Sequence, residues 1–344
     1  MIEIEPFTVQ LAQPLETAAR TITEREGFLV FVEHDGEQGV GEATPLPGWT
    51  EPYDDCRRAV VRAAEIAEEL DWGIALARTE NAPAARHALA LALAEARARR
   101  VDGPLYRHLD GDRFVASVPV NATLGDADPA TTADAAERAI EEGFDCLKVK
   151  VGARSVTADT ERLRAVRDRV GDGVELRADA NGAWDREQAR GAVEAFAPLG
   201  VAYVEQPLPA ADLGGHAALR GGPVGVALDE SLRDHSVEEI LDSGAADVLV
   251  VKPMVAGGPD RARQAAIAAR RAGVDAVVST TVDAVVARTG AVHVAASLPD
   301  LGPCGLATGS MLVADLSPDP APVVDGAIEV PQERGLGLPD RPAW

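Results

Sequence analysis

Five charged side chains recur at nearly equal spacing through the middle of the sequence: Lys150, Asp179, Glu205, Asp229 and Lys252. The intervals between them are 29, 26, 24 and 23 residues. One repeating unit of a strand and a helix takes about 25 residues or somewhat more, so each side chain occupies the same place on successive units. Polar residues also collect at strand ends because loops begin there, but that does not explain three consecutive acids between lysines. The spacing therefore predicts that all five converge on one mouth.

The three acids indicate a divalent metal site. Carboxylates on neighbouring strands repel one another, and at least one would be driven towards protonation unless a cation lay between them. Ligation by carboxylates alone suits Mg²⁺ or Mn²⁺ rather than zinc. Strand parity leaves both Asp229 and Glu230 open as the third ligand beside Asp179 and Glu205. Asn181 lies on the same strand face as Asp179, where it would orient that ligand, contact substrate or simply begin a turn.

The lysines indicate acid–base chemistry. Of the 33 basic residues only three are lysine, namely Lys148, Lys150 and Lys252. Arginine stays protonated in a protein whereas lysine can act as a base, so these lysines mark positions where arginine would fail. Lys148 and Lys150 share a strand face, and two close ammonium groups lower a lysine pKa. With Lys252 across the mouth, the set is suited to removing the proton α to a metal-bound carboxylate, with the metal stabilising the enediolate. Arg177, one step deeper, is expected to form an interior ion pair.

Alternating strand-like and helical stretches must position these side chains. The strand-like runs are 116–123, 146–151, 174–181, 201–208, 224–231, 246–253 and 275–281, with 305–310 as a short eighth. Helical periodicity fills the intervals between them, such as 132–143 and 258–273. Seven or eight strand–helix repeats predict an α/β fold with a parallel sheet closed into a barrel. No G-x-G-x-x-G or P-loop motif is present, which disfavours a nucleotide-binding fold.

The sequence before and after the repeats has a different pattern. Residues 1–43 are β-rich, with a hairpin turn at Asp35-Gly36, and 54–70 and 81–100 are alanine-rich and helical. The tail contains one short strand-like run, 328–331, and is expected to return to the N-terminal region.

Composition excludes several kinds of partner. The 344 residues carry a formal net charge of -23, which argues against nucleic acid and against an anionic membrane surface. No window approaches ~18 uninterrupted apolar residues, and the acidic N-terminus lacks a signal-peptide pattern, so we expect a cytoplasmic protein. Three scattered cysteines do not form a disulfide scaffold. The acidic surface suits a halophile's concentrated cytosol.

The chain resembles the enolase superfamily, specifically its muconate-lactonizing subgroup, in an ordered set of motifs: KVK (148–150), DAN (179–181), VEQP (204–207), LDES (228–231) and VKP with AGG (251–258). The resemblance covers essentially the whole chain. It implies a (β/α)7β modified TIM barrel over 113–315. It also implies an α+β capping domain, formed by residues 1–112 and the returning segment 316–344.

The resemblance also implies roles for individual residues. Asp179, Glu205 and Asp229 would hold Mg²⁺, or Mn²⁺, which selects Asp229 over Glu230. Lys150 would be the acid/base on one face and Lys252 its counterpart on the other, with Lys148 tuning Lys150. Lysine bases and Mg²⁺ stabilisation are the general pattern of that superfamily. Homo-oligomers are common in it.

Within the subgroup, the o-succinylbenzoate synthases are the most similar, through GEATPLPGWTE (41–51), PVNATLG (119–125) and STT (279–281). That similarity implies a small-molecule carboxylate substrate, a succinyl-hydroxycyclohexadiene carboxylate, dehydrated to 2-succinylbenzoate in menaquinone biosynthesis. Loops 15–26 and 44–53 would close over the mouth of the barrel and bind the succinyl group of the substrate. Three neighbouring residues carry hydroxyl groups: Ser279, Thr280 and Thr281. Their hydroxyls would donate hydrogen bonds to the substrate, or the residues would have only a structural role in a β-strand.

Other activities stay open. The same two-lysine site serves an N-acylamino-acid racemase, and a muconate-type cycloisomerase is a further alternative. Dipeptide epimerases of the family hold the substrate's amino group with an Asp-x-Asp pair near the eighth strand. Residues 302–310 contain no acid, which disfavours that activity. An inactive homologue is disfavoured because the loss of catalysis should first remove a lysine or a metal ligand, and all five positions are intact. A phosphate-binding aldolase on the same barrel is disfavoured because the three acids would then have no role.

Overall fold

The chain begins with an antiparallel sheet of three strands: β1 (Ile2–Glu16), β2 (Thr21–His34) and β3 (Glu37–Ala43). The structure is a computed structural model that describes residues 2–16, 21–110 and 113–339. Asp35 and Gly36 join β2 to β3 with φ values of 54° and 84°, as the favoured two-residue hairpin turn requires. The predicted β-rich start and its turn are therefore confirmed.

Four helices follow this sheet: α1 (Tyr53–Glu69), α2 (Trp72–Ala77), α3 (Pro83–Arg100) and α4 (Leu105–Asp110). The alanine-rich helix α3 packs directly on β3. Close approach is possible because Gly39 and Gly41 lack side chains. A Cβ at either position would collide with the carbonyl oxygen of Ala92 or Ala88 on α3.

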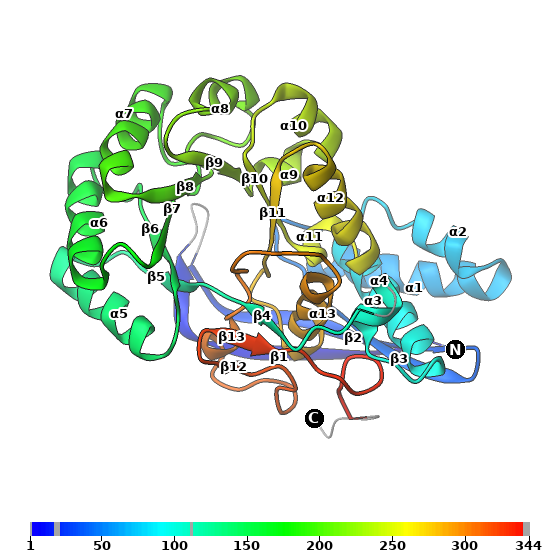
Figure 1. Cartoon of the computed structure of the whole chain (residues 1–344). Coiled ribbons are helices and arrows are strands. Elements are labelled where there is room, and N and C mark those ends of the chain that lie inside the picture. Colours follow the sequence, from blue (N-terminus) through cyan, green and yellow to red (C-terminus); the bar gives the residue numbers. More distant parts are fainter. Residues whose placement is uncertain (1, 17–20, 111–112, 340–344) are drawn as a thin grey trace.

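A seven-stranded parallel sheet forms the body of the molecule. In spatial order from β5 to β11 its strands are β5 (Ala122–Leu124), β6 (Cys146–Lys150), β7 (Glu175–Asp179), β8 (Val201–Glu205), β9 (Gly225–Leu228), β10 (Val248–Val251) and β11 (Asp275–Val278). Figure 1 shows the sheet curling into a barrel with the connecting helices outside it. These helices are α5 (Pro129–Glu141), α6 (Val156–Val170), α7 (Arg186–Phe196), α8 (Leu213–Leu219), α10 (Val237–Ser243), α12 (Pro259–Arg271) and α13 (Val285–Ala296). The predicted barrel fold is confirmed.

The eighth strand position is held by only two residues. Cys304 pairs with Val120, beside β5, and Gly305 pairs with Ser279, just after β11. These two bridges join the first and last strands of the parallel sheet. The predicted run 305–310 therefore does not form a strand. The pairing starts one residue earlier, and the chain turns into a short 3₁₀ helix at Gly309–Met311.

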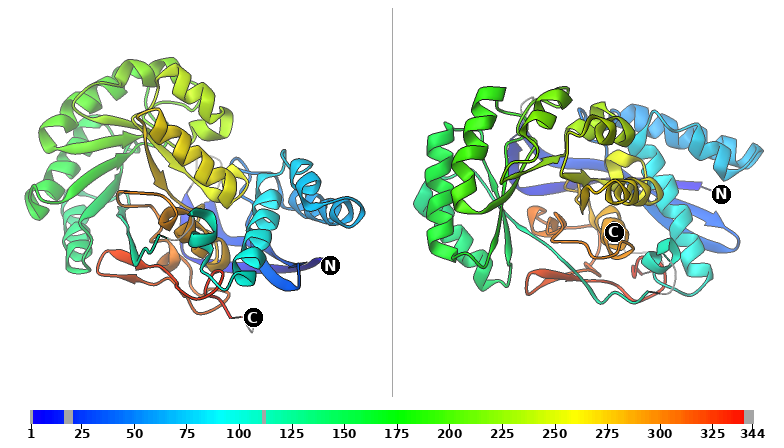
Figure 2. Two further views of the ribbon diagram at one scale, coloured as in Figure 1. Left: turned by 45° about the vertical axis from the view of Figure 1, so that its right-hand side comes forward. Right: turned by 45° about the horizontal axis from the view of Figure 1, so that its top comes forward.

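The predicted first barrel strand, 116–123, is divided between two sheets. Its beginning is β4 (Ser117–Pro119), which pairs antiparallel with β13 (Ala327–Glu329) of the C-terminal tail. Only β5 joins the barrel. Two side chains further along the tail, Leu336 and Leu338, are buried with the first sheet, as the predicted return to the N-terminal region requires. In Figure 2, both views show helices α1–α3 lying beside the ring of barrel helices.

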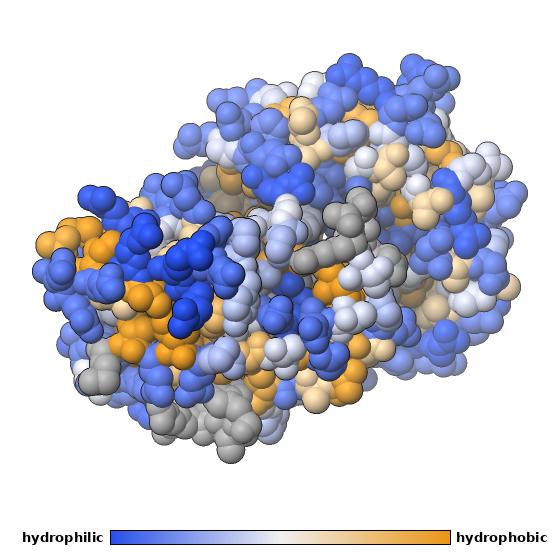
Figure 3. Space-filling model, turned by 180° about the vertical axis from the view of Figure 1, so that it is seen from behind, coloured by the Kyte–Doolittle hydropathy of each residue, from blue (hydrophilic) through white to orange (hydrophobic). Residues whose placement is uncertain are grey.

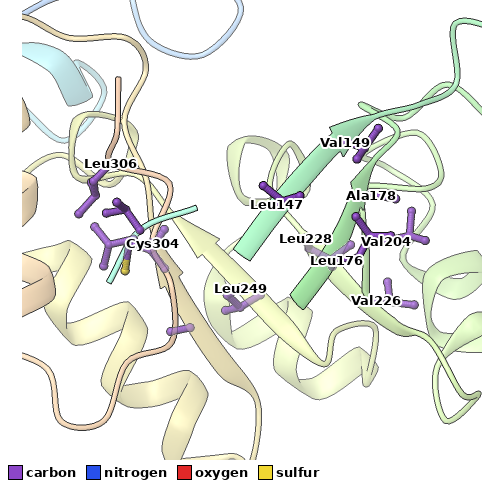
Figure 4. Packing of buried hydrophobic residues seen from close by; sticks show 14 of the residues in the cluster. Leu147, Val149, Leu176, Ala178, Val204, Val226, Leu228, Leu249, Cys304 and Leu306 are labelled. Carbon is purple, nitrogen blue, oxygen red and sulfur yellow. The ribbon is translucent and has the colours of Figure 1, made fainter. Parts of the chain in front are cut away.

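Alternation along the strands separates the core from the barrel mouth. Leu147 and Val149 are fully buried in the cluster between the sheet and its helices, which Figure 4 shows with Leu176 and Val204. Burying one such side chain stabilises the fold by about 1.5–3 kcal/mol. The residues that alternate with them on β6 are Lys148 and Lys150, so packing of the apolar face directs both lysines into the barrel.

The surface is mainly hydrophilic on the face that Figure 3 shows from behind, in keeping with the net charge of -23. Across the described ranges, no helix is long and apolar enough to span a bilayer. The predicted division at 112/113 and 315/316 stays a prediction.

Candidate active site

The five regularly spaced side chains lie at the carboxyl ends of five consecutive strands. Lys150, Asp179 and Glu205 are the last residues of β6, β7 and β8, and Asp229 and Lys252 directly follow β9 and β10. Lys150 pairs in register with Asp179, and Asp179 with Glu205. In-register neighbours on a sheet are about 4.8 Å apart, so these side chains are adjacent.

The two lysines of β6 bind the acids of the next two strands. Lys148 Nζ lies 3.0 and 2.9 Å from the two carboxylate oxygens of Glu205 and 3.3 Å from Asp179 Oδ2. Lys150 Nζ donates to Asp179 Oδ2 at 2.6 Å. Both lysines therefore face the barrel interior, as their i, i+2 spacing predicts.

Lys252 approaches the acids from β10, four strands further round the sheet. Its Nζ donates to Asp229 Oδ2 at 2.6 Å and lies 3.8 Å from the ring centroid of Trp49. Trp49 belongs to the loop 44–53 between β3 and α1. A cation is attracted to the negative face of an indole, so this ammonium is held between a carboxylate and an aromatic ring.

These contacts shift the pKa values of the buried groups. Burial alone would lower the pKa of Lys148, but the carboxylates of Glu205 and Asp179 raise it well above its ordinary value. Burial works against ionisation of Asp179, yet Lys150 and Lys148 lower its pKa below the usual range. Burial raises the pKa values of Glu205 and Asp229. The lowered lysine pKa expected from Lys148–Lys150 repulsion is therefore not found at Lys148, because the carboxylates outweigh the neighbouring ammonium.

The acids have the chemistry of a magnesium site but are paired with lysines in this arrangement. Among residues 2–16, 21–110 and 113–339, no three His, Cys, Asp or Glu side chains are close enough together to hold a metal ion. The lysine ammonium groups contact the carboxylate oxygens instead. Two buried oxygens at this site, Asp229 Oδ1 and Glu230 Oε2, have no hydrogen-bond partner in the described part of the chain. An unpaired buried carboxylate oxygen is costly, and a hard cation held by Asp179, Glu205 and Asp229 would satisfy that of Asp229.

Asn181 connects the acids to the lysine of β6. Its backbone N–H donates to Asp179 Oδ1 at 3.1 Å, and its side-chain oxygen accepts from Lys150 Nζ at 2.9 Å. Its side-chain nitrogen donates to Glu230 Oε1 at 3.0 Å. The contact with Asp179 is made by the backbone, and Asn181 begins a turn with a φ of 46°, as one of the interpretations left open by the sequence expects. A role of Asn181 in orienting Asp179 or in substrate contact stays a prediction.

The three hydroxyl residues after β11 already have partners within the protein. Ser279 donates to the Gly305 carbonyl at 3.1 Å, Thr280 bonds Thr308 at 3.0 Å, and Thr281 donates to Asp283. These contacts favour a structural role, and substrate contact by Ser279, Thr280 and Thr281 stays a prediction. Arg177 is buried and forms an ion pair, 2.6 Å from Glu175, but that partner is 38% exposed, so the pair lies at the edge of the interior rather than within it.

Loop 44–53 is ordered by its own hydrogen bonds and by the barrel. Trp49 N–H donates to the Leu46 carbonyl, and Leu46 N–H donates to Thr50 Oγ1, both at 2.8 Å. Arg233, after β9, donates to the Gly48 carbonyl at 2.9 Å. The other predicted mouth loop, 15–26, consists largely of the ends of β1 and β2, and its tip at 17–20 lies outside the described residues.

Sequence reasoning did not single out Trp49, Glu42 or Gln206, although all three lie at this end of the barrel. A tryptophan in a Pro/Gly loop was the available signal for Trp49. Glu42 and Gln206 lie within the quoted motifs 41–51 and 204–207, but that their side chains are buried is visible only in the structure.

Two family models match the chain. The model described as Enolase C-terminal domain-like matches residues 131–342, which is more than half of the sequence. The model described as MenC, N-terminal domain matches residues 3–96.

Similar proteins catalyse different reactions. The L-Ala-D/L-Glu epimerase of Bacillus subtilis (strain 168) is 30% identical, over 98% of this chain and 95% of that protein. The o-succinylbenzoate synthase of Thermobifida fusca (strain YX) is 33% identical, over 93% and 86%. The solved structure of a dipeptide epimerase from Enterococcus faecalis V583, complexed with Mg and L-Leu-L-Tyr, has a TM-score of 0.85 at 26% identity, with 98% of both chains covered. These similarities identify a family rather than one reaction.

Proposed function

Since the chain belongs to the enolase superfamily, we propose that it is an o-succinylbenzoate synthase-like dehydratase. It would convert a succinyl-hydroxycyclohexadiene carboxylate to 2-succinylbenzoate, as a cytoplasmic enzyme of menaquinone biosynthesis. The observation that carries the proposal is the pair Lys150 and Lys252, which face three acids from opposite sides of one mouth. The match to the MenC N-terminal domain and the Thermobifida relative support this choice of reaction.

Lys150 is the proposed base. Its side chain is 36% exposed, against 13% for Lys148 and 12% for Lys252, so it is the lysine most accessible to substrate. As a free amine it would take the proton α to the ring carboxylate and then return that proton to the leaving hydroxyl. One C–H bond and the neighbouring C–O bond break, a ring double bond forms and one water leaves.

Lys252 is proposed to remain charged. Burial lowers its pKa, but Asp229 and Glu230 more than compensate and raise that pKa above its ordinary value. The Trp49 ring adds a second attraction for the ammonium form. A fixed positive charge on this side of the mouth would stabilise negative charge as it develops on the substrate carboxylate.

Asp179, Glu205 and Asp229 are the proposed ligands of Mg²⁺, with Mn²⁺ as a substitute. When bound, such an ion would supply positive charge to the carboxylate oxygens of the substrate. The unpartnered Asp229 Oδ1 supports this assignment, and magnesium is present in the solved structure of the Enterococcus relative. Lys148 would compensate part of the negative charge of Glu205 and Asp179.

A racemase of N-acylamino acids is the second candidate. Two lysines on opposite sides of one mouth are what racemisation requires, since the free amine of one removes a proton and the ammonium of the other donates its own proton to the opposite face of the carbanion. A dipeptide epimerase is disfavoured because residues 302–310, which contain the bridges at the eighth strand position, include no acid.

A substrate panel tests the proposal. The purified protein, in Mg²⁺ and molar KCl, would be given the succinyl-hydroxycyclohexadiene carboxylate, N-succinylamino acids, L-Ala-L-Glu and cis,cis-muconate. We expect the first to be converted fastest, with activity lost on chelation and restored by Mg²⁺ or Mn²⁺. Activity that survives thorough chelation would contradict the metal assignment. Faster racemisation of N-succinylamino acids would favour the second candidate.

A further inference from the structure

The side chain of Gln206 joins the ends of β8 and β9, next to two of the proposed metal ligands. It is fully buried. Its Oε1 accepts from the backbone N–H groups of Asp229 and Ser231, both at 3.1 Å. Its Nε2 donates to Ser231 Oγ at 2.9 Å and to the Leu208 carbonyl at 3.0 Å. Both donors and both acceptor sites of the amide are therefore used.

The backbone of Gln206 is held as firmly as its side chain. Its N–H donates to the Ala227 carbonyl of β9 at 2.8 Å, and its carbonyl accepts from Gly182 N–H, after β7, at 2.7 Å. Its φ is 41°, in the left-handed region that non-glycine residues rarely adopt. Such a conformation persists only where its surroundings enforce it, and it is concentrated at functional sites.

The loop that accepts from Gln206 is fixed by a buried histidine. His216 Nδ1 bonds the Asp212 carbonyl at 2.8 Å, so its Nε2 is left to accept from Leu208 N–H at 3.3 Å. Burial lowers the pKa of His216, which keeps the ring neutral for this role. The Leu208 carbonyl is thereby positioned as a partner for the Gln206 amide.

The neutral amide suits its surroundings better than a carboxylate would. Glu205 precedes Gln206 in the chain, and Asp229 and Glu230 lie on the adjacent loop. A carboxylate at position 206 would add another buried negative charge and would have no proton to donate to Leu208. A glutamine holds the strand ends together without adding charge.

We propose that Gln206 is a positioning residue that fixes the backbone of Asp229 relative to Glu205, so that both carboxylates can reach one cation. The inference rests on the proposed metal site. Glu205 is its chain neighbour, and Asp229 N–H is bound by its side chain, so one residue sets the relative placement of two ligands from different strands. Partners behind metal ligands typically change affinity by about 10- to 100-fold when removed.

The test measures Mn²⁺ binding without substrate, from the electron paramagnetic resonance signal of free Mn²⁺. Gln206→Met keeps the side-chain length but removes all four hydrogen bonds. We expect its Mn²⁺ dissociation constant to rise about 10- to 100-fold. The matched control is Gln332→Met, in which the lost partners are Tyr106, Val115 and Val330, far from the barrel mouth. Its Mn²⁺ affinity should equal that of the unsubstituted protein.

Circular dichroism would establish that each variant is folded. If Gln206→Met does not fold, Ser231→Ala removes a single partner of the amide and should weaken Mn²⁺ binding by a few fold. Unchanged Mn²⁺ affinity in a folded Gln206→Met variant would overturn the inference. If Gln206→Met does not fold, unchanged Mn²⁺ affinity in Ser231→Ala would overturn it. Absence of Mn²⁺ binding by the unsubstituted protein would overturn the metal site and this inference together. Tight binding without dehydratase activity would refute only the proposed reaction.

Discussion

The indole ring of Trp49 lies over the ammonium group of Lys252, with 3.8 Å between Nζ and the ring centroid. The two residues come from different parts of the fold, since Trp49 lies between β3 and α1 and Lys252 follows β10. The guanidinium of Arg233 lies 5.9 Å from the same ring and donates to the neighbouring Gly48 carbonyl. One aromatic side chain therefore links the N-terminal loop to a proposed catalytic lysine.

Replacement of Trp49 by leucine should lower kcat/KM. A desolvated cation–π contact is worth about 2 kcal/mol, which corresponds to about a 30-fold effect, and its loss would leave Lys252 less firmly placed. Steady-state kinetics on the best substrate would measure the change. The matched control is Trp72→Leu on α2, which should leave kcat/KM within about twofold. An equal effect of both substitutions would contradict a specific role for Trp49.

Asp229→Asn should weaken Mn²⁺ binding far more than Glu230→Gln. Asp229 and Glu230 each have one buried oxygen without a partner in the described chain. Asp229, however, is buried like Asp179 and Glu205, whereas Glu230 is half-buried and its Oε1 is bound by the Asn181 side chain. Replacing one of three carboxylate ligands should cost at least about 100-fold in affinity, against a few fold for a nearby charge. Titration calorimetry with Mn²⁺ would measure both variants. The opposite ranking would transfer the third ligand to Glu230.

Glu42 should make stability depend on pH. Its buried carboxylate accepts from the N–H groups of Ala284 and Ala287 at the start of α13, both at 2.8 Å, and from Thr44. Burial, with a contribution from Asp283, raises its pKa from 4.5 to about 7. The folded state therefore binds the proton more tightly than the unfolded state. The stability that this provides is complete below about pH 4.5 and is lost as the pH rises through about 7.

Glu42→Gln removes that titration. The unfolding free energy of the unsubstituted protein minus that of the variant should fall by a few kcal/mol, on the order of 3, between pH 4.5 and 7.5. Urea unfolding at four pH values would measure the difference. A difference that stays constant, or that grows with pH, would show that Glu42 does not have a raised pKa in the folded protein.

Salt should stabilise the protein. With a net charge of -23, repulsion between like charges opposes the compact state. Added salt shortens the distance over which this repulsion acts. The urea midpoint should rise between low and molar KCl. A midpoint that falls with added KCl would contradict adaptation of the acidic surface to concentrated salt.

The spacing of charged residues predicted much of the site because a parallel barrel repeats regularly. Lys150, Asp179 and Glu205 end consecutive in-register strands, so intervals in the sequence translate into adjacency in space. Alternation along β6 likewise predicted that Lys148 and Lys150 share a face.

Contacts between distant segments could not be predicted in this way. The eighth strand position depends on two isolated bridges rather than on a periodic run, and Trp49 reaches Lys252 through the docking of a loop. The pKa of Lys148 depends on the balance between one neighbouring ammonium and two carboxylates, which requires distances. The internal partners of Ser279, Thr280 and Thr281 depend on the chain beyond residue 282 and were likewise invisible in the sequence.

The most direct measurement is turnover of the succinyl-hydroxycyclohexadiene carboxylate in Mg²⁺, followed by ultraviolet absorbance, for the unsubstituted protein, Lys150→Ala and Lys150→Arg. Arginine keeps the positive charge but provides no base at accessible pH, so both variants should lose several orders of magnitude in kcat, about 10³-fold or more. Rapid conversion to 2-succinylbenzoate by the unsubstituted protein alone would establish both the reaction and its base. Near-normal turnover by Lys150→Arg would contradict the role of Lys150, and no conversion by the folded, metal-loaded protein would contradict the proposed reaction.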